Sequence, residues 1–310
     1  MALSGWVCVV TGASRGIGKG VALQLSEAGA TVYITGRQED TLRQSASEVE
    51  ERGGRCLPVV CDSTKEEDIK RLFERVQKEQ NGRLDVLVNN AYGGVNAIFE
   101  NMGKKFWEAD PSLWDAINNT GLRGHYFCSV YAARLMVSQG RGLIVVISSL
   151  GGVRYFFNVP YGVGKAACDR LAADTAIELR SRGVASVSLW PGAVQTELFH
   201  QHISSPDADP RVLYNFSDVF ENGESTEFSG KCIVKLAKDK DLMSMTGQVL
   251  MTSDLARRYG MNDVDGRSVA DYRSMKFLLS QLPYLSWLSP ITPPFLRLPR
   301  FVLSMASGRF

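Results

Sequence analysis

The chain has 310 residues, a formal net charge of +2 at pH 7 and 45% hydrophobic residues. The near-neutral charge gives no argument for a nucleic-acid partner, and the apolar content is that of a globular protein. Length and composition together are consistent with one large α/β domain.

Targeting segments, metal ligands and disulfides are not expected. No stretch reaches eighteen uninterrupted apolar residues, which argues against a conventional transmembrane helix. The N-terminus has no basic leader, so we expect no secretory signal. The six cysteines form no C-x-x-C pair, which predicts reduced thiols packed in a cytosol-facing protein rather than zinc or disulfides.

The first strand and helix predict a phosphate-binding turn. Residues 6–10 are apolar and β-branched, and a helical pattern follows the turn at residues 11–18. Gly12 allows a tight turn, Gly16 lets the backbone approach a phosphate, and Gly18 allows close contact between helix and strand. The helix then offers free N–H groups to a pyrophosphate. The alternative is an ordinary connection between a strand and a helix.

Strand-like and helical runs alternate along the rest of the chain. The expected strands are 31–35, 56–61, 84–88, 143–148, 185–190 and 249–251, and the expected helices are 38–52, 65–80, 112–137 and 162–182. This order predicts a Rossmann-type, doubly wound parallel sheet flanked by helices, with ligands at the carboxyl ends of its strands.

A serine, a tyrosine and a lysine carry the candidate chemistry. Tyr161 and Lys165 share one helical face, and Ser149 lies twelve residues before Tyr161. A phenol titrates near pH 10, and a neighbouring ammonium favours the phenolate and lowers the pKa of the phenol. The pattern predicts proton exchange with a substrate during hydride transfer. The alternative is an amphipathic helix with a buried aromatic and a solvated lysine.

Basic residues at the second strand favour NADP(H) over NAD(H). NAD-binding folds usually place an acidic residue there, but the first carboxylate after this strand is Glu39. Arg37 and Arg15 could instead clamp the 2′-phosphate of NADP, because guanidinium geometry suits phosphate. Arg37 could alternatively stack on adenine or face solvent.

These motifs resemble the short-chain dehydrogenase/reductase family from about residue 5 to residue 254. The spacing Gly12-x3-Gly16-x-Gly18 is similar to that family's dinucleotide fingerprint. The later family motifs follow in order: Asp62, Asn89-Asn90-Ala91, Ser149, Tyr161, Lys165 and Pro191-Gly192-x-Val194-x-Thr196.

The resemblance implies a role for each matching residue. The cofactor-binding set would be Gly12, Ser14, Arg15, Gly16, Ile17, Gly18, Arg37, Asp62, Asn90, Tyr161, Lys165, Val194 and Thr196. Asp62 would bind the adenine amino group, Asn90 would lie beside the riboses, and Thr196 would orient the carboxamide. Asp62 could alternatively cap the next helix, and Thr196 could be an ordinary loop residue. Ser149, Tyr161 and Lys165 would be catalytic, and Ser149 and Tyr161 would also contact the substrate. The resemblance further implies a dimer or a tetramer, the usual assemblies of the family.

The chain departs from the family pattern at three places. Tyr92 replaces a glycine after Asn89-Asn90-Ala91, so the loop is reshaped or Tyr92 lines the pocket. Gly121 stands where the family has a catalytic asparagine, which a water or a backbone carbonyl could replace. The gap between Ser149 and Tyr161 is about one residue short, which makes Ser148 an alternative to Ser149.

The segment 197–229 corresponds to the substrate lid of the family. Its apolar residues are Phe199, Ile203, Leu213, Tyr214, Phe216 and Phe220. The aromatic residues 155–157 are expected to lie opposite them. They favour lipophilic carbonyls or alcohols such as steroids, retinoids or xenobiotic ketones, and steroid metabolism as the setting. They could alternatively belong to the core or to a subunit contact.

The domain is expected to end at residue 254, with a C-terminal extension at 255–310. Residues 272–310 contain no acidic side chain, and their basic residues are Arg273, Lys276, Arg297, Arg300 and Arg309. A segment that combines basic and apolar residues is suited to binding an anionic membrane surface. The resemblance implies peripheral attachment at the cytosolic face of the endoplasmic reticulum. A cytoplasmic protein whose tail wraps the domain or a neighbouring subunit is the alternative.

The main functional hypothesis is an NADPH-dependent carbonyl reductase or alcohol dehydrogenase. A cofactor-binding scaffold or sensor with lapsed catalysis is the alternative, and Tyr92 and Gly121 are its support. A third hypothesis makes the tail a partner-binding arm.

Overall fold

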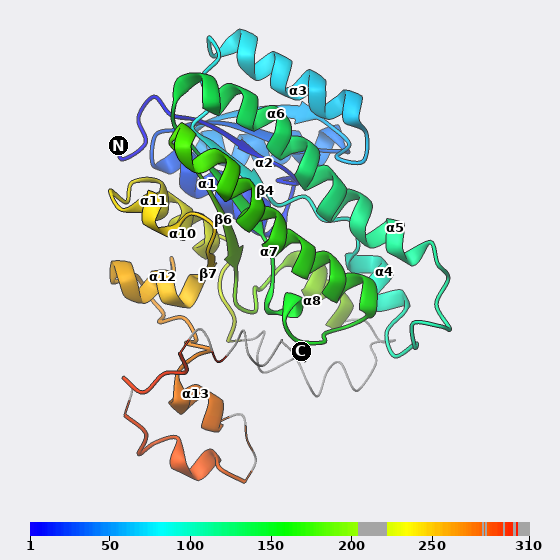
Figure 1. Ribbon diagram of the computed structural model, residues 1–310, viewed down its shortest axis with the longest axis vertical. Coiled ribbons are helices and arrows are strands. Elements are labelled where there is room, and N and C mark those ends of the chain that lie inside the picture. The colour runs from blue at the N-terminus through cyan, green and yellow to red at the C-terminus, as the bar shows by residue number, and fades with distance from the viewer. Residues whose placement is uncertain (204–221, 281, 283, 294, 300–301, 303–310) are drawn as a thin grey trace.

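Seven apolar runs pair into one parallel sheet in the order β3-β2-β1-β4-β5-β6-β7 (Figure 1). The computed structural model describes residues 1–203, 222–280, 282, 284–293, 295–299 and 302. The strands are β1 (Val7–Val10), β2 (Thr31–Gly36), β3 (Arg55–Val60), β4 (Val86–Asn89), β5 (Gly142–Ile147), β6 (Val184–Trp190) and β7 (Val249–Met251). The predicted doubly wound sheet is confirmed.

Helices cover both faces of the sheet, which is why its strands are continuous apolar runs. Cys8 and Val10 of β1 face the core shared with α1 (Gly16–Glu27), α2 (Glu39–Glu51) and α10 (Phe228–Ala237). The alternate residues Val7 and Val9 face the core shared with α3 (Glu66–Glu79), α6 (Gly124–Gln139) and α7 (Val159–Leu179).

The order of strands reverses at β1, which pairs with β2 on one side and with β4 on the other. Connections leave the sheet in opposite directions at such a point, and a crevice opens beyond the carboxyl ends of the strands. The backbone N–H of Thr11 donates to the carbonyl of Val88 at 3.0 Å, which joins the turn after β1 to the end of β4. The crevice therefore begins at the predicted glycine turn.

Two predicted helices differ from the structure. The segment 112–137 is α5 (Leu113–Asn118), a π-helix (Asn119–Arg123) and then α6, so the predicted continuous helix is wrong. The helix predicted at 162 begins at Val159, because the Asn158 side chain accepts a hydrogen bond from the Tyr161 N–H at 2.9 Å. Pro160 in the first turn also suits a helix start.

Several short helices were not predicted, because each has too few residues for a clear apolar period. They are α4 (Val95–Glu100), α8 (Glu197–Ile203), α10 (Phe228–Ala237), α11 (Leu242–Met245), α12 (Thr252–Tyr259), α13 (Met275–Ser280) and 3₁₀ turns at Leu150–Gly152, Arg180–Arg182 and Ser286–Leu288. The predicted boundary at residue 254 lies inside α12, and the domain core continues to Met261.

Buried ion pairs join the C-terminal extension to the domain. Arg273 contacts Asp254 at 2.6 Å, and Arg297 contacts Asp254 and Asp271. The Tyr272 hydroxyl accepts a hydrogen bond from the Ala193 N–H at 2.9 Å. Beyond these anchors the segment with α13 projects from one end of the domain, below α12 (Figure 1). In the described part of the chain, no helix is both long and apolar enough to cross a membrane.

Candidate active site

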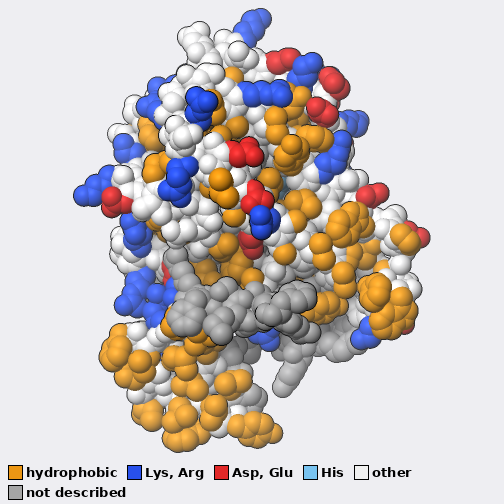
Figure 2. Space-filling view, viewed as in Figure 1, with side chains coloured by type: hydrophobic (Ala, Val, Ile, Leu, Met, Phe, Trp, Pro, Cys, Tyr) orange, Lys and Arg blue, Asp and Glu red, His pale blue; other side chains and the backbone are white. Residues whose placement is uncertain are grey.

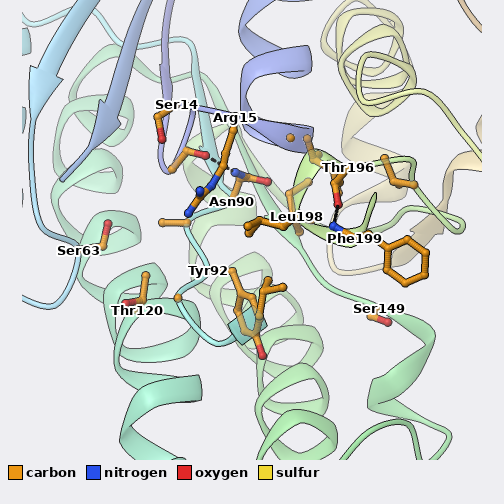
Figure 3. Close-up of a pocket in the computed structure, with 18 of the residues that line it drawn as sticks. Ser14, Arg15, Ser63, Asn90, Tyr92, Thr120, Ser149, Thr196, Leu198 and Phe199 are labelled. Carbon is orange, nitrogen blue, oxygen red and sulfur yellow. Dashed lines mark hydrogen bonds between the residues drawn. The ribbon is translucent and has the colours of Figure 1, made fainter. Parts of the chain in front are cut away.

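A cavity of about 360 Å³ lies at the carboxyl ends of the strands. Every predicted site residue except Gly18 lines it: Gly12, Ser14, Arg15, Gly16, Ile17, Arg37, Asp62, Asn90, Ser149, Tyr161, Lys165, Val194 and Thr196. Figure 3 shows Ser14 and Arg15 at one end of this cavity, with Tyr92, Thr120 and Ser149 toward the other. The cavity is therefore elongated between a basic end and an end with hydroxyl and aromatic groups.

The glycine turn brings α1, β1 and β4 into close contact. Gly12 has a φ of +66°, and a Cβ there would lie 2.6 Å from Ala91 Cα. Gly18 lies behind the cavity wall, where a Cβ would meet the Gly12 carbonyl at 2.3 Å and Asn90 Nδ2 at 2.4 Å. Gly18 therefore makes close helix–strand contact and does not line the cavity, so its assignment to the cofactor-binding set stays a prediction.

Asn90 fixes this turn from β4. Its Nδ2 donates to the carbonyls of Thr11 at 3.0 Å and Gly12 at 2.9 Å. Asp62 accepts hydrogen bonds from the Thr64 N–H at 3.0 Å and the Thr64 hydroxyl at 2.8 Å. The N-terminal cap of α3 is Lys65, so Asp62 does not cap that helix, which removes the alternative role for Asp62.

Two exposed guanidinium groups stand at the basic end of the cavity. Arg15 precedes α1 and Arg37 follows β2, and both line the cavity. Neither side chain has an ion pair or a side-chain hydrogen bond to another residue that the structure describes. Burial acts to raise the pKa of Asp62, but the hydrogen bonds from Thr64, and to a smaller extent the charge of Arg37, hold it below its usual value. The pair is free to bind an anion.

An anionic side chain already lies at the N-terminus of α1. The Gly16 N–H donates to Glu197 Oε2 at 2.9 Å, and Lys19 lies 3.6 Å from the other Glu197 oxygen. Glu197 begins α8, directly after Thr196, whose hydroxyl accepts from the Phe199 N–H at 3.4 Å. Thr196 is thus both a cavity residue and part of the start of α8 (Figure 3).

Tyr161 is half-buried on α7, within reach of Ser149. Burial raises the pKa of Tyr161, and a hydrogen bond with Ser149 acts in the opposite direction. The Tyr161 ring packs nearly perpendicular to the rings of Phe157 and Tyr92, at centroid distances of 5.1 and 6.2 Å. The expected lowering of the pKa by Lys165 is therefore corrected for this structure, because desolvation is the largest effect on Tyr161.

Ser149 and Ser148 have separate roles. The Ser149 hydroxyl accepts from the Gly151 N–H at 3.1 Å and caps the 3₁₀ turn opposite Tyr161. The buried Ser148 hydroxyl donates to the backbone carbonyl of Lys165 at 3.0 Å. The structure thus brings Ser149, not Ser148, to the phenol.

Lys165 is 9% exposed, and its ammonium lies beneath the cavity. Its Nζ donates to the Ile147 carbonyl at the end of β5 at 3.1 Å and lies 6.0 Å from the centre of the Tyr161 ring. Burial lowers the pKa of Lys165 from its usual value, against the effect of Cys168 and Asp169. The alternative of a solvated lysine is therefore wrong.

Sequence reasoning missed a buried polar layer under Lys165. His125 Nε2 lies 3.0 Å from the Ala91 carbonyl, and burial lowers the pKa of His125 to about 3, so the ring is neutral. The Cys168 thiol donates to the Gly121 carbonyl at 3.2 Å. Asn118 Nδ2 donates to the Pro160 carbonyl at 3.2 Å and joins α5 to α7. No sequence motif pointed to His125, because a lone histidine in a helix has no diagnostic spacing.

The end of the cavity that holds Tyr92 and Ser149 is also lined by apolar side chains. Its lining residues there include Val95, Ile98, Phe99, Phe157, Leu198 and Phe199. Tyr155 is 69% exposed and does not line the cavity, so the predicted 155–157 contribution reduces to Phe157. The side chain of Ile203 and the whole of Leu213, Tyr214, Phe216 and Phe220 lie outside the described residues.

Comparison with known proteins defines the class. Residues 6–206 match the family model described as short chain dehydrogenase. The chain belongs to this family of short-chain dehydrogenase/reductase oxidoreductases, whose members bind nicotinamide cofactors.

Individual relatives match nearly all or most of the chain. The chain is 59% identical to dehydrogenase/reductase SDR family member 1 of Homo sapiens over 310 residues, which is 99% of each chain. It is 33% identical to a 3beta-hydroxysteroid dehydrogenase of Mediterraneibacter gnavus over 229 residues, 73% of this chain and 79% of that one.

Solved structures share the fold. A short-chain type dehydrogenase/reductase from Mycobacterium marinum is 28% identical with a TM-score of 0.68, covering 80% of this chain and 94% of that chain. A 7 alpha-hydroxysteroid dehydrogenase complexed with NADH and 7-oxo glycochenodeoxycholic acid is 22% identical with a TM-score of 0.69, covering 87% and 97%. The second likeness is one of fold alone.

Proposed function

We propose that this protein is an NADP(H)-dependent oxidoreductase of the carbonyl reductase type, which interconverts lipophilic carbonyls and alcohols. One observation carries the proposal: Ser149, Tyr161 and Lys165 meet in a cavity whose opposite end presents Arg15 and Arg37. The first group can exchange a proton with a substrate oxygen, and the second can bind a phosphate.

The residues fit a nicotinamide dinucleotide. Gly12 leaves no room for a side chain in the turn, and α1 presents the Gly16 N–H at its start, where a pyrophosphate would bind. Arg15 and Arg37 would hold a 2′-phosphate, and Asp62, with one carboxylate oxygen bound to Thr64, would face the adenine. When bound, the cofactor supplies or accepts the hydride.

The chain itself handles the substrate oxygen. In reduction, Ser149 donates a hydrogen bond to the carbonyl oxygen, and the Tyr161 phenol gives it a proton as the alkoxide forms. The raised pKa keeps Tyr161 protonated and ready to donate. Lys165, held by the Ile147 carbonyl, supplies the positive charge that stabilises the phenolate left behind. In the oxidation of an alcohol, the proton moves in the opposite direction, from the substrate hydroxyl to the Tyr161 phenolate.

The apolar end of the cavity supports a lipophilic substrate. Ile98, Phe99, Phe157 and Phe199 offer only hydrocarbon and aromatic surface next to Tyr161. Such a lining favours a steroid, a retinoid or a xenobiotic ketone over a sugar or a charged metabolite. The relative named as a 3beta-hydroxysteroid dehydrogenase is consistent with this class, and steroid metabolism is the setting we propose.

We further propose peripheral attachment to the cytosolic face of the endoplasmic reticulum through the C-terminal extension. Figure 2 shows apolar side chains gathered on the lobe that contains α13. Tyr284, Trp287, Ile291 and Phe295 are 91%, 67%, 71% and 69% exposed. Aromatic and aliphatic side chains at the tip of an anchored lobe suit the interfacial region of a bilayer. We also propose that the protein forms a homo-oligomer, because members of this family usually do.

A substrate panel tests the enzyme assignment. The full chain is mixed with NADPH or NADH and with ketosteroids, retinal, aromatic ketones and quinones, while absorbance of the reduced cofactor is followed. We expect turnover of at least one lipophilic carbonyl and higher catalytic efficiency with NADPH. Tight NADPH binding without turnover of any carbonyl, or of the matching alcohols with NADP⁺, would instead support a scaffold or sensor.

A further inference from the structure

The Tyr92 ring fills the space between Gly121, Tyr161 and Lys165. A Cβ on Gly121 would lie 2.6 Å from Tyr92 Cδ2, so the ring occupies room that a side chain at position 121 would need. The Tyr92 ring also packs with Ile98, Leu113 and Ile117. Tyr92 lines the cavity and is labelled there in Figure 3. Tyr92 thus lies in the wall that carries the proposed chemistry.

The face of this ring is turned to the Lys165 ammonium. Lys165 Nζ lies 4.9 Å from the centre of the Tyr92 ring, within the range of a cation–π interaction. An ammonium has three donors, and Ile147 is the one hydrogen-bond acceptor that the described residues offer to Lys165 Nζ. A π face attracts a cation without accepting its proton. It is therefore suited to a buried lysine that must stay charged.

The hydroxyl of Tyr92 takes no part in this contact. It is buried and has no hydrogen-bond partner among the residues that the structure describes. Burial raises the pKa of Tyr92, so the phenol stays neutral and its ring keeps the electron distribution of an uncharged aromatic. The ring, not the hydroxyl, is the part that faces the ammonium.

We propose that Tyr92 is a positioning residue, whose ring face holds the Lys165 ammonium charged and beside Tyr161. This role rests on the proposed function of the site. It gives one reason for the combination of Tyr92 with Gly121: the ring requires a residue without a side chain beneath it.

The other groups around Lys165 do not replace this contact. Cys168 and Asp169 on α7 raise the pKa of Lys165, but their hydrogen bonds go elsewhere: the Cys168 thiol donates to the Gly121 carbonyl, and Asp169 accepts from the Ser188 hydroxyl and the Trp190 indole N–H. His125 on α6 is neutral. Tyr161 is a protonated phenol whose ring centre is farther from Nζ than that of Tyr92, at 6.0 Å.

Ring fluorination tests the proposal without changing the shape of the site. Tyr92 is replaced by Phe and by phenylalanines with one, two or three ring fluorines, because each fluorine weakens the negative potential of the ring face. The full chain carries ¹³C-labelled lysine, and the pKa of Lys165 is read by NMR titration of its Cε signal, assigned with Lys165→Met. Tyr92→Leu is a further variant, and the unfolding midpoint of each variant shows whether it is folded.

We expect Tyr92→Phe to keep the pKa of Lys165, and each added fluorine to lower it, by about 0.5 to 1 unit for the full series. The alkaline fall of kcat should move to lower pH by the same amount, while the KM for the ketone stays nearly constant. An unchanged pKa of Lys165 across folded fluorinated variants would overturn the proposal. If the wild type turns over no carbonyl, the proposed function fails, whereas the NMR titration still decides whether Tyr92 holds Lys165.

Discussion

Glu197 Oε2 accepts a hydrogen bond from the Gly16 N–H at 2.9 Å, so a carboxylate lies where α1 would receive a pyrophosphate. The two residues are 181 positions apart, and the contact joins α8 to the glycine turn. A carboxylate at this place competes with a phosphate both for the N–H and for the positive end of the helix dipole.

Glu197→Gln should therefore bind NADPH more tightly. We expect a decrease in Kd of about 3- to 10-fold, since the competing contact is partly exposed. The measurement is a fluorescence titration of NADPH at low ionic strength. Glu48→Gln is the matched control, because Glu48 pairs with the same Lys19 at 3.1 Å without contacting the turn. Equal affinities in wild type and Glu197→Gln would refute the competition.

The Arg15 and Arg37 side chains should set cofactor choice. The variant Arg15→Ala/Arg37→Ala is expected to lower kcat/KM for NADPH by about 10- to 100-fold, because two charge-assisted contacts to a phosphate are lost. The value for NADH should change less than about threefold, since NADH has no 2′-phosphate. Steady-state kinetics with both cofactors give the two ratios. Parity of NADPH and NADH in the wild type contradicts the phosphate clamp.

Glu224 should make the protein less stable as the pH rises from about 4.5 to about 7. The Glu224 side chain is buried and accepts from the Thr252 hydroxyl at 2.5 Å, and burial raises its pKa from 4.5 to about 7. Between these values the folded protein binds more protons than the unfolded one, so the free energy of unfolding falls as the pH increases. The contribution is present in full below pH 4.5 and is lost above pH 7.

Glu224→Gln removes this titration. We expect the variant to be more stable than wild type at pH 8, by about 2 kcal/mol, and to show a smaller difference at pH 5. Urea unfolding at the two pH values provides the comparison. The same gain in stability at both pH values would show that charge on Glu224 is not the cause.

The tip of the extension should carry membrane binding. Replacing Tyr284, Trp287, Ile291 and Phe295 by Ser should reduce partitioning to anionic vesicles at least tenfold, because four exposed apolar side chains are removed. The ion pairs of Arg273 and Arg297 stay intact, whereas deletion of residues 272–310 would leave Asp254 buried without them. Trp107→Ser is the control, since Trp107 is 70% exposed elsewhere. Full vesicle binding by the quadruple variant would assign the membrane contact, if any, to another part of the chain.

The sheet and the glycine turn could be predicted because they depend on local patterns. Mostly apolar runs of three to seven residues are typical of strands covered on both faces, and Gly12 and Gly18 follow the first run at fixed spacing. Tyr161 and Lys165 could be placed on one helix from their spacing alone. These features need no knowledge of distant contacts.

The remaining parts of the site depend on contacts between distant segments. Tyr92 and Gly121 are conspicuous in the sequence, but only the fold shows that the ring of one fills the space left by the other. The break after Asn118 has no proline to mark it, and the contact from Glu197 to Gly16 joins segments that share no motif. The buried state of Lys165 was likewise missed, because helical spacing does not show how deep a side chain lies.

The most direct measurement of the central claim is the single-turnover rate of Tyr161→Phe with NADPH and a ketone that the wild type reduces. The variant should bind NADPH with nearly unchanged Kd and transfer hydride at least about 100-fold more slowly, because the proton donor is lost while the ring remains. Tyr155→Phe, which removes an exposed hydroxyl outside the cavity, should match the wild type. A rate for Tyr161→Phe within a few-fold of wild type would contradict the role of Tyr161 as the group that gives the substrate its proton.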